Sequence, residues 1–194
     1  MEIKIPDAKS VIVFASYRTG STALCDYYAN NMLHVTNWDE AFHSALDFKT
    51  TKFKNCVNDG DGFVVKVMPD QFADHQKYIT ELAEKCWLVK IVRTDIAAQA
   101  ASMYCCYQTN NWHLEKDMVL ESYQIDMDTP SMDGTLKEIK AFNDQLNLLP
   151  FVFDQIFDYQ DLGHIQSKYK VMQKPTNYND ILQFMYNHSK KGDN

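Results

Sequence analysis

The chain has 194 residues, of which 45% are hydrophobic and 23% charged; this fits one globular domain with a full core and excludes a disordered chain. Its 19 Lys and Arg against 26 Asp and Glu give a net charge of −7, so we expect no general binding to the phosphates of nucleic acid. No apolar run approaches the roughly 20 residues of a membrane helix. The five cysteines form no CxxC pair, and we expect a cytoplasmic protein with neither a membrane nor a nucleic acid as partner.

Short apolar runs alternate with amphipathic segments along the chain. The runs at 11–16, 62–68, 86–93 and 151–159 have the composition of strands covered on both faces. Apolar residues at helical spacing indicate helices at 21–33, 71–85, 96–107, 133–149 and 178–188. The segment 34–61 has no clean period, and we expect a loop with a short helix there. The alternation predicts an α/β fold: a single domain over residues 1–194 with a parallel β-sheet flanked by helices.

Only two arginines, Arg18 and Arg93, accompany 17 lysines. Arg18 follows the strand 11–16, Arg93 ends the strand 86–93, and each lies just before a helix. Ligands of open parallel sheets bind outside the carboxyl ends of the strands, close to helix N-termini. Because a guanidinium binds phosphate through two parallel hydrogen bonds, we expect both arginines to face one anion-binding crevice.

The loop ASYRTGST at 15–22 has the length of the phosphate loop GxxxxGK[ST] but lacks its first glycine and its lysine. Gly20 permits a turn that directs backbone N–H groups inward, and Ser21 and Thr22 add hydroxyl groups. We expect Ser21 or Thr22 to cap the first helix and Asp95 to cap the helix after Arg93. The loop therefore predicts an anion site for something other than a nucleoside triphosphate.

These motifs resemble a known family. YRTGSTAL is similar to the 5′-phosphosulfate loop of sulfotransferases, and RTDIAAQAAS followed by QTNNWH resembles their 3′-phosphate motif, in the form found in trehalose 2-sulfotransferase-like bacterial enzymes. GFVVKVM and IFDYQDL are also similar to family strands, so the likeness covers most of 11–162. It implies a P-loop-like sulfotransferase fold and a PAPS-dependent enzyme. Such an enzyme transfers the sulfuryl group of 3′-phosphoadenosine 5′-phosphosulfate (PAPS) to an acceptor hydroxyl and releases 3′,5′-adenosine bisphosphate (PAP), with no metal expected.

The resemblance assigns the donor-binding residues. The 5′ end of the donor would be held by Arg18 and its neighbours Thr19, Gly20, Ser21 and Thr22. Arg93 and Ser102 would hold the 3′-phosphate. Lys174, with Gln173 beside it, lies in a tail segment similar to the family loop that closes over the nucleotide.

The resemblance also offers catalytic residues. An alcohol attacks poorly until its proton is removed, and the family's Glu-x-Phe segment matches Glu40, which is our choice of base, with Asp39 and His43 as rivals. Lys66 matches the family pattern G-x-x-x-K-x-M and is a candidate contact for the sulfuryl group or the leaving phosphate; the alternative is a plain salt bridge, because a buried lysine needs an anionic partner. Trp112 and Tyr107 are candidates for the acceptor pocket or for core packing.

Two other functions stay open. A small P-loop-type nucleoside or sugar kinase would bind ATP with Mg²⁺ and would need an acidic residue near the loop, for which Asp95 and Asp154 are the candidates. A non-catalytic nucleotide-binding module would bind PAP without turnover. The acceptor is expected to be a small-molecule or glycan hydroxyl that the sequence does not specify, and a homodimer is neither required nor excluded.

Overall fold

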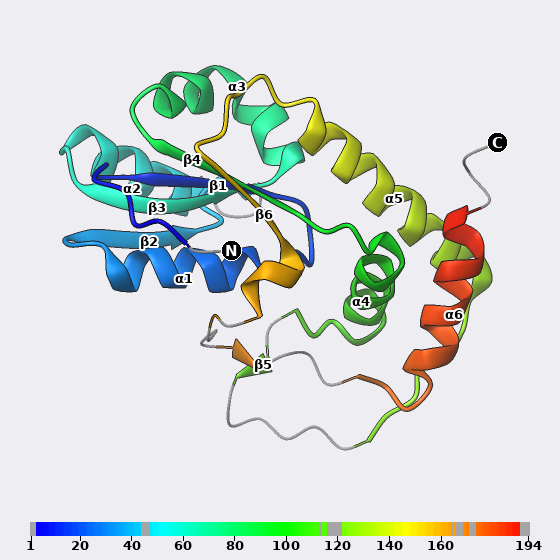
Figure 1. The fold of residues 1–194 in the computed structure, drawn as a ribbon. Coiled ribbons are helices and arrows are strands. Elements are labelled where there is room, and N and C mark those ends of the chain that lie inside the picture. The colour runs from blue at the N-terminus through cyan, green and yellow to red at the C-terminus, as the bar shows by residue number, and fades with distance from the viewer. Residues whose placement is uncertain are drawn as a thin grey trace.

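Five parallel strands form the central sheet of the computed structural model (Figure 1). The structure describes residues 3–43, 47–112, 114–115, 122–163, 165, 169–170 and 174–190. In spatial order the strands are β2 (Val35–Asp39), β3 (Gly62–Val67), β1 (Val11–Ala15), β4 (Trp87–Val92) and β6 (Gln155–Asp158). Every residue of β1 and β3 is buried, which explains why both read as continuous apolar runs.

The strand order places a crevice beside β1. This strand pairs with β3 on one side and β4 on the other, with Val13 opposite both Lys66 and Val89. After β1 the chain forms β2 and β3 on one side of it, and then β4 and β6 on the other side, so the direction in which strands are added reverses at β1. In parallel sheets the carboxyl edge at such a reversal is where ligands bind.

In the described part of the chain, six helices and a short 3-10 helix cover the sheet or follow its strands. The helices are α1 (Ser21–Asn31), α2 (Asp47–Asn58), α3 (Pro69–Ala83), α4 (Ile96–Thr109), α5 (Thr129–Asn147) and α6 (Tyr178–Ser189), with η2 (Tyr159–Leu162) after β6. A small antiparallel pair, β5 (Leu114–Glu115) with β7 (Tyr169–Lys170), lies outside the main sheet.

Alternate side chains of the strands build two apolar layers. Ile12 and Phe14 of β1 pack on the face covered by α2 and α3, whereas Val11, Val13 and Ala15 pack on the face covered by α1. In Figure 1, α3 lies above the sheet and α1 below it. Parallel sheets need such cover on both faces because both sides of each strand are apolar.

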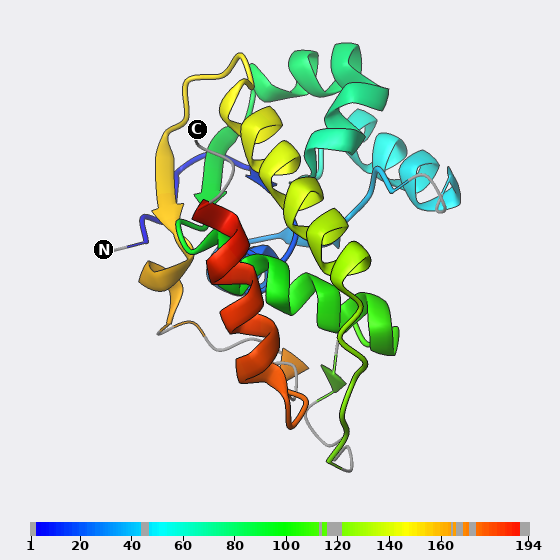
Figure 2. The ribbon, with the colours of Figure 1, turned by 90° about the vertical axis from the view of Figure 1, so that its right-hand side faces the viewer.

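A third apolar cluster joins α4, α5 and α6 beyond the end of the sheet to which β4 leads (Figures 1 and 2). The alanines of α4 keep its surface narrow, so that α5 and α6 approach it closely. Tyr104 of α4 is fully buried among them and donates a hydrogen bond to the backbone carbonyl of Asp126. This helical group forms the wall that faces the carboxyl edge of the sheet.

The predicted α/β fold, with its parallel sheet flanked by helices, is confirmed. The expectation of a loop with one short helix at 34–61 is wrong, because this segment contains the edge strand β2 as well as α2. The sequence of β2, VTNWD, is half exposed and mostly polar, so it lacks the apolar run of the central strands. Among the described helices none has the length and apolar character that crossing a membrane requires.

Candidate functional site

A cavity of about 1030 Å³ opens at the carboxyl edge of the sheet, between the loop after β1 and the wall formed by α4 and α6. Tyr17, Glu40 and Trp112 belong to its lining. It is also lined by the residues chosen above for donor binding and catalysis: Arg18, Thr19, Gly20, Ser21, Thr22, Glu40, Lys66, Arg93, Ser102 and Lys174. These residues come from the ends of β1, β2, β3 and β4, from α1 and α4, and from the segment before α6. The fold therefore gathers them at one place.

The loop between β1 and α1 adopts an unusual backbone conformation. Arg18 and Gly20 have positive φ angles of 59° and 76°, which turn the chain sharply into α1. The N-cap of α1 is Gly20, so the expected cap at Ser21 or Thr22 is wrong; α1 has neither a side-chain cap nor an acidic residue in its first turn. The first backbone N–H groups of α1 are therefore left to a ligand, and the helix dipole favours an anion there.

Arg93 is held from two sides but keeps one donor without an acceptor. Its Nη1 donates to the backbone carbonyl of Arg18 at 2.8 Å, and its guanidinium carbon lies 4.3 Å from the ring centre of Tyr159. Its buried Nε has no hydrogen-bond partner among the described residues. Burial lowers the pKa of Arg93 from its ordinary value, as happens when a cation loses water without full compensation. The group is thus ready for an anionic acceptor.

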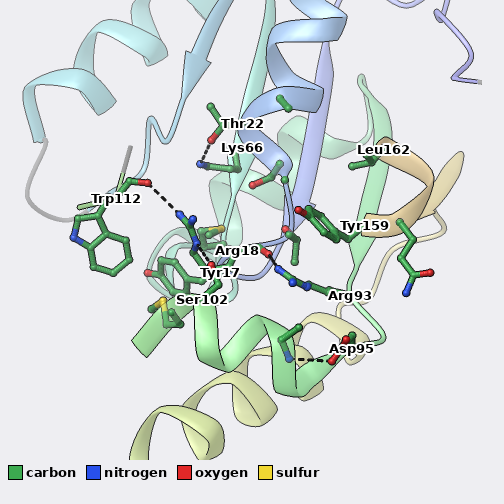
Figure 3. A pocket seen from close by; sticks show the side chains of 18 of the residues that line it. Tyr17, Arg18, Thr22, Lys66, Arg93, Asp95, Ser102, Trp112, Tyr159 and Leu162 are labelled. Carbon is green, nitrogen blue, oxygen red and sulfur yellow. Dashed lines mark hydrogen bonds between the residues drawn. The ribbon is translucent and has the colours of Figure 1, made fainter. Parts of the chain in front are cut away.

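Arg18 reaches in a different direction (Figure 3). Its Nε donates to Oγ of Ser102 at 3.0 Å, and its Nη1 donates to the backbone carbonyl of Trp112 at 3.1 Å. The sequence analysis grouped Ser102 with Arg93 around the 3′-phosphate, whereas in the structure the hydroxyl of Ser102 is bonded to Arg18. All three side chains nevertheless line the same cavity.

Neither arginine forms an ion pair with a described carboxylate, since the two ion pairs of the described residues both belong to Lys66. Buried or half-buried guanidinium groups are normally paired. In a chain with a net charge of −7, two arginines that line one cavity and have no carboxylate partner in the described part of the chain are suited to a negatively charged ligand.

Lys66 lies at the centre of a second polar cluster. Its side chain is 3% exposed and its Nζ lies 2.7 Å from Oε1 of Glu40, 3.1 Å from Oδ1 of Asp39 and 3.2 Å from Oγ1 of Thr22. Burial lowers the pKa of Lys66, but the two carboxylates and the hydrogen bond to Glu40 outweigh burial, so the pKa lies above its ordinary value. Lys66 is therefore a cation that links the base candidates to the N-terminus of α1. It forms the salt bridge weighed as the alternative, and it also lines the cavity.

The end of β2 explains how two adjacent carboxylates reach the same lysine. Consecutive strand residues point to opposite faces, but the register between β2 and β3 shifts between Asn37 and Asp39, and Asp39 has a positive φ of 47°. This irregularity turns the chain so that both Asp39 and Glu40 contact Lys66. Of the three candidate bases, Glu40 and His43 line the cavity and Asp39 is outside its lining.

The structure adds a site residue that the sequence analysis missed. Tyr159 of η2 lies between the loop and Arg93: a Cβ at Gly20 would come within 3.1 Å of two carbons of its ring, whose centre is 4.3 Å from the Arg93 guanidinium. A residue with a Cβ at this position would require the ring to shift by a few tenths of an ångström, in addition to the strain of the positive φ. The segment IFDYQDL was noted for its similarity to a family strand, but nothing local in it singles out the tyrosine.

Gln99 of α4 belongs to the motif RTDIAAQAAS, but the motif gave it no role of its own. It is fully buried, and its Nε2 donates to Ser16 Oγ at 2.8 Å and to the backbone carbonyl of Tyr17 at 2.5 Å. Its Oε1 accepts a hydrogen bond from Asn143 of α5 at 3.0 Å. These bonds join the loop after β1 to α4 and α5, and so fix the backbone just before Arg18. The signal available in the sequence was an uncharged amide in an otherwise apolar stretch of helix.

The remaining candidates are placed as follows. Lys174 lines the cavity, with its Nζ 4.2 Å from the ring centre of Tyr178, whereas Gln173 lies outside the described residues. Tyr107 and Trp112 line the cavity and make an edge-to-face contact with ring centres 5.5 Å apart. This contact is consistent with either of the roles considered for them.

The two acidic residues considered for a kinase lie at opposite ends of the sheet. Asp95 caps α4 as expected, accepting from Ala98 N at 2.9 Å, and it lines the cavity. Asp154 instead accepts from the backbone N of Leu88, near the amino end of β4.

The chain matches no protein-family model and no curated protein.

Proposed function

We propose that the protein is a sulfotransferase, which transfers the sulfuryl group of PAPS to the hydroxyl of a small-molecule or glycan acceptor. The observation that carries the proposal is the convergence of Arg18 and Arg93, the chain's only arginines, on one cavity without a carboxylate partner among the described residues. PAPS carries negative charge on two separated groups, so a protein that binds it needs two cationic positions. The two guanidinium groups and the N-terminus of α1 supply them.

The proposed chemistry is an in-line displacement at sulfur. The acceptor oxygen forms a bond to sulfur while the bond from sulfur to the bridging oxygen of the 5′-phosphate breaks, and PAP leaves with the electron pair. Glu40 takes the proton of the acceptor hydroxyl. Lys66, the amides at the start of α1 and Arg18 stabilise the negative charge that develops on the leaving phosphate. Positioning and electrostatics would supply most of the rate, as in phosphoryl transfer.

The contact between Lys66 and Thr22 favours this reaction over a kinase reaction. Thr22 aligns with the residue of the GxxxxGK[ST] loop whose hydroxyl binds Mg²⁺, but here its Oγ1 is 3.2 Å from the ammonium group of Lys66. A cation at that distance repels a divalent metal ion. Asp154, one of the two acidic residues that a kinase could use, lies near the amino end of β4. Sulfuryl transfer by PAPS needs no metal at this position.

Calorimetry with PAP provides the test. We expect the wild type to bind PAP with a Kd of roughly 1–10 μM and to bind ATP with Mg²⁺ more weakly by about 10-fold or more. Arg93→Ala removes one cationic group, and a loss of about 10- to 100-fold in PAP affinity is expected from the charged hydrogen bonds it supplies. Lys52→Ala is the matched control, because it removes one positive charge from an exposed position on α2.

Transfer itself is tested by incubating the protein with sulfur-labelled PAPS and a panel of sugars, phenols and other hydroxyl compounds. Label in an acceptor supports a sulfotransferase. Tight PAP binding without transfer to any acceptor would support the non-catalytic module instead. Absence of PAP binding, or an Arg93→Ala protein that binds as tightly as the wild type, would refute the proposal.

A further inference from the structure

We infer that Gln71 is a positioning residue for Glu40: from the first turn of α3, its side-chain amide holds the carboxylate on the side opposite Lys66. The inference rests on the proposed function in one respect, namely the role of Glu40 as the base. The contact between the two side chains is independent of that role. No sequence motif pointed to Gln71, which occupies an ordinary helical position in its segment.

Gln71 is buried, and its amide has one chemically sensible orientation. The residue is 3% exposed. Its Oε1 accepts from the backbone N–H of Met68 at 3.3 Å, within the capping box that begins α3. Its Nε2 lies 3.4 Å from Oε2 of Glu40. Because an amide oxygen would be repelled by the carboxylate and an amide NH₂ by the backbone N–H, only this orientation makes both contacts attractive.

Glu40 is thereby held through both of its oxygens. Lys66 contacts Oε1 at 2.7 Å and Gln71 contacts Oε2 at 3.4 Å. The two partners lie five positions apart, at the end of β3 and in the first turn of α3, so the turn at Met68 and Pro69 sets their separation. A carboxylate has about four lone-pair sites, which leaves positions on both oxygens for the proton of an acceptor. A base fixed in this way loses little entropy when it engages its substrate.

The donor from Gln71 also favours the charged form of Glu40, since a hydrogen bond to a carboxylate stabilises that form. The titratable groups around Glu40 come from several elements. Lys66 of β3 forms an ion pair with it, and Cys25 of α1 and Tyr17 of the loop after β1 interact electrostatically with it. Asp39 of β2 shares Lys66, Asp70 of α3 accepts a hydrogen bond from Tyr17, and His43 lines the same cavity. Gln71 itself carries no charge, so replacing it removes no ion pair from Glu40.

Gln71→Glu tests the inference with little change in shape. The new side chain retains an oxygen for the N–H of Met68, and glutamate is a normal capping-box residue at this position, but its second oxygen faces Glu40. We expect the titration of Glu40 in this variant to move to higher pH than in the wild type, because like charges disfavour the ionised form. Carboxyl-carbon NMR titration measures this shift, with Glu40→Gln identifying the resonance. Gln71→Met removes the donor to Glu40 without adding charge, and also the oxygen that accepts from the N–H of Met68; it should give a smaller shift in the same direction.

Two further measurements complete the design. In the wild type, the Nε2 protons of Gln71 should shift with the same midpoint as the carboxyl carbon of Glu40, a readout that needs no variant to fold. Gln145→Glu adds the same charge at an exposed position of α5 and should leave the Glu40 titration unchanged. In sulfuryl transfer, the acid limb of the kcat/KM profile of Gln71→Glu should move to higher pH along with the Glu40 titration, while PAP affinity stays within about threefold.

The outcomes separate the two claims. The inference is overturned if the chemical shifts of the Gln71 amide protons do not change as Glu40 titrates. It is also overturned if folded Gln71 variants leave the midpoint of the Glu40 titration unchanged. If the midpoint of the Glu40 titration moves in Gln71→Glu but the acid limb of its kcat/KM profile does not, Gln71 has no role in positioning the base. A wild type that binds no PAP overturns the proposed function, and the NMR titration still decides whether Gln71 holds Glu40.

Discussion

The guanidinium of Arg93 donates a hydrogen bond of 2.8 Å to the backbone carbonyl of Arg18, although 75 positions separate the two residues in the chain. The bond joins the carboxyl ends of β1 and β4, which are neighbours in the sheet. It leaves the side chain of Arg18 free to reach Ser102 and Trp112. One arginine thus supports the backbone from which the other extends, and both remain available to a ligand in the cavity.

Replacing Arg18 by lysine tests whether the several N–H donors of its planar guanidinium matter beyond its positive charge. Lysine keeps the positive charge but has a single nitrogen, so it cannot contact Ser102 and Trp112 as Nε and Nη1 do. We expect Arg18→Lys to weaken PAP binding by about 10-fold, and Ser102→Ala to weaken it by about threefold. Calorimetry measures both. Equal affinities for wild type and Arg18→Lys would show that charge alone suffices.

The loop glycine gives a prediction with a control inside the same chain. Gly20 and Gly60 have nearly equal positive φ angles of 76° and 79°, but a Cβ on Gly20 would lie 3.1 Å from the Tyr159 ring, whereas a Cβ on Gly60 would meet nothing within 4 Å. Gly60→Ala should cost about 1 kcal/mol through backbone strain alone. Gly20→Ala should cost about 2–3 kcal/mol, because the ring must also move.

Urea denaturation measures these two costs. Gly20→Ala should in addition lose most of its PAP binding, because displacing Tyr159 also displaces its contact with Arg93, whereas Gly60→Ala should bind as the wild type does. Equal destabilisation by the two substitutions would mean that the ring of Tyr159 moves aside with no measurable loss of stability.

Lys66→Met should destabilise the protein by about 2–3 kcal/mol near neutral pH, because it leaves the partly buried carboxylates of Asp39 and Glu40 without their cation. The folded-state pKa of Lys66 lies above the ordinary value of 10.5. A raised pKa means that its contribution is fully present below about pH 10 and is lost as the pH rises through the folded-state pKa. The difference in unfolding free energy between wild type and Lys66→Met should therefore be constant between about pH 7 and pH 9 and shrink as the pH rises above the ordinary lysine pKa of 10.5 toward the higher folded-state pKa.

Urea titrations over this range test that behaviour. Tyrosines with raised pKa values, such as Tyr78 and Tyr178, titrate in both proteins, so the difference between the two proteins isolates Lys66. A difference that stays constant up to the highest pH would show that Lys66 does not lose its proton there.

The base is identified by three substitutions measured side by side. If Glu40 removes the acceptor proton, Glu40→Gln should lower kcat by about 100-fold or more, the usual contribution of general base catalysis. Asp39→Asn and His43→Gln should lower it by less than about 10-fold, since neither group is then the base. PAP affinity, measured on each variant, distinguishes a catalytic loss from a damaged donor site. A larger loss with His43→Gln than with Glu40→Gln would move the assignment to the imidazole.

The sequence by itself determined the central strands and the position of both arginines relative to them. Short β-branched apolar runs such as VIVFA are typical of strands covered on both faces, and their alternation with amphipathic helices favours a parallel sheet between helices. Once the sheet is parallel, Arg18 and Arg93 must lie at its carboxyl edge because each follows a strand. The edge strand β2 was not predicted, because its residues are mostly polar and half-exposed and so show no apolar strand pattern.

Only the tertiary structure decided which side chains meet at that edge. The contact of Ser102 with Arg18 spans 84 positions, the contact of Gln71 with Glu40 spans 31, and the place of Tyr159 between Gly20 and Arg93 depends on three separate segments. Local propensity and periodicity act within a few residues. Partners this distant in the chain are chosen by how helices and strands pack, a property of the folded chain as a whole, so no local pattern contains them.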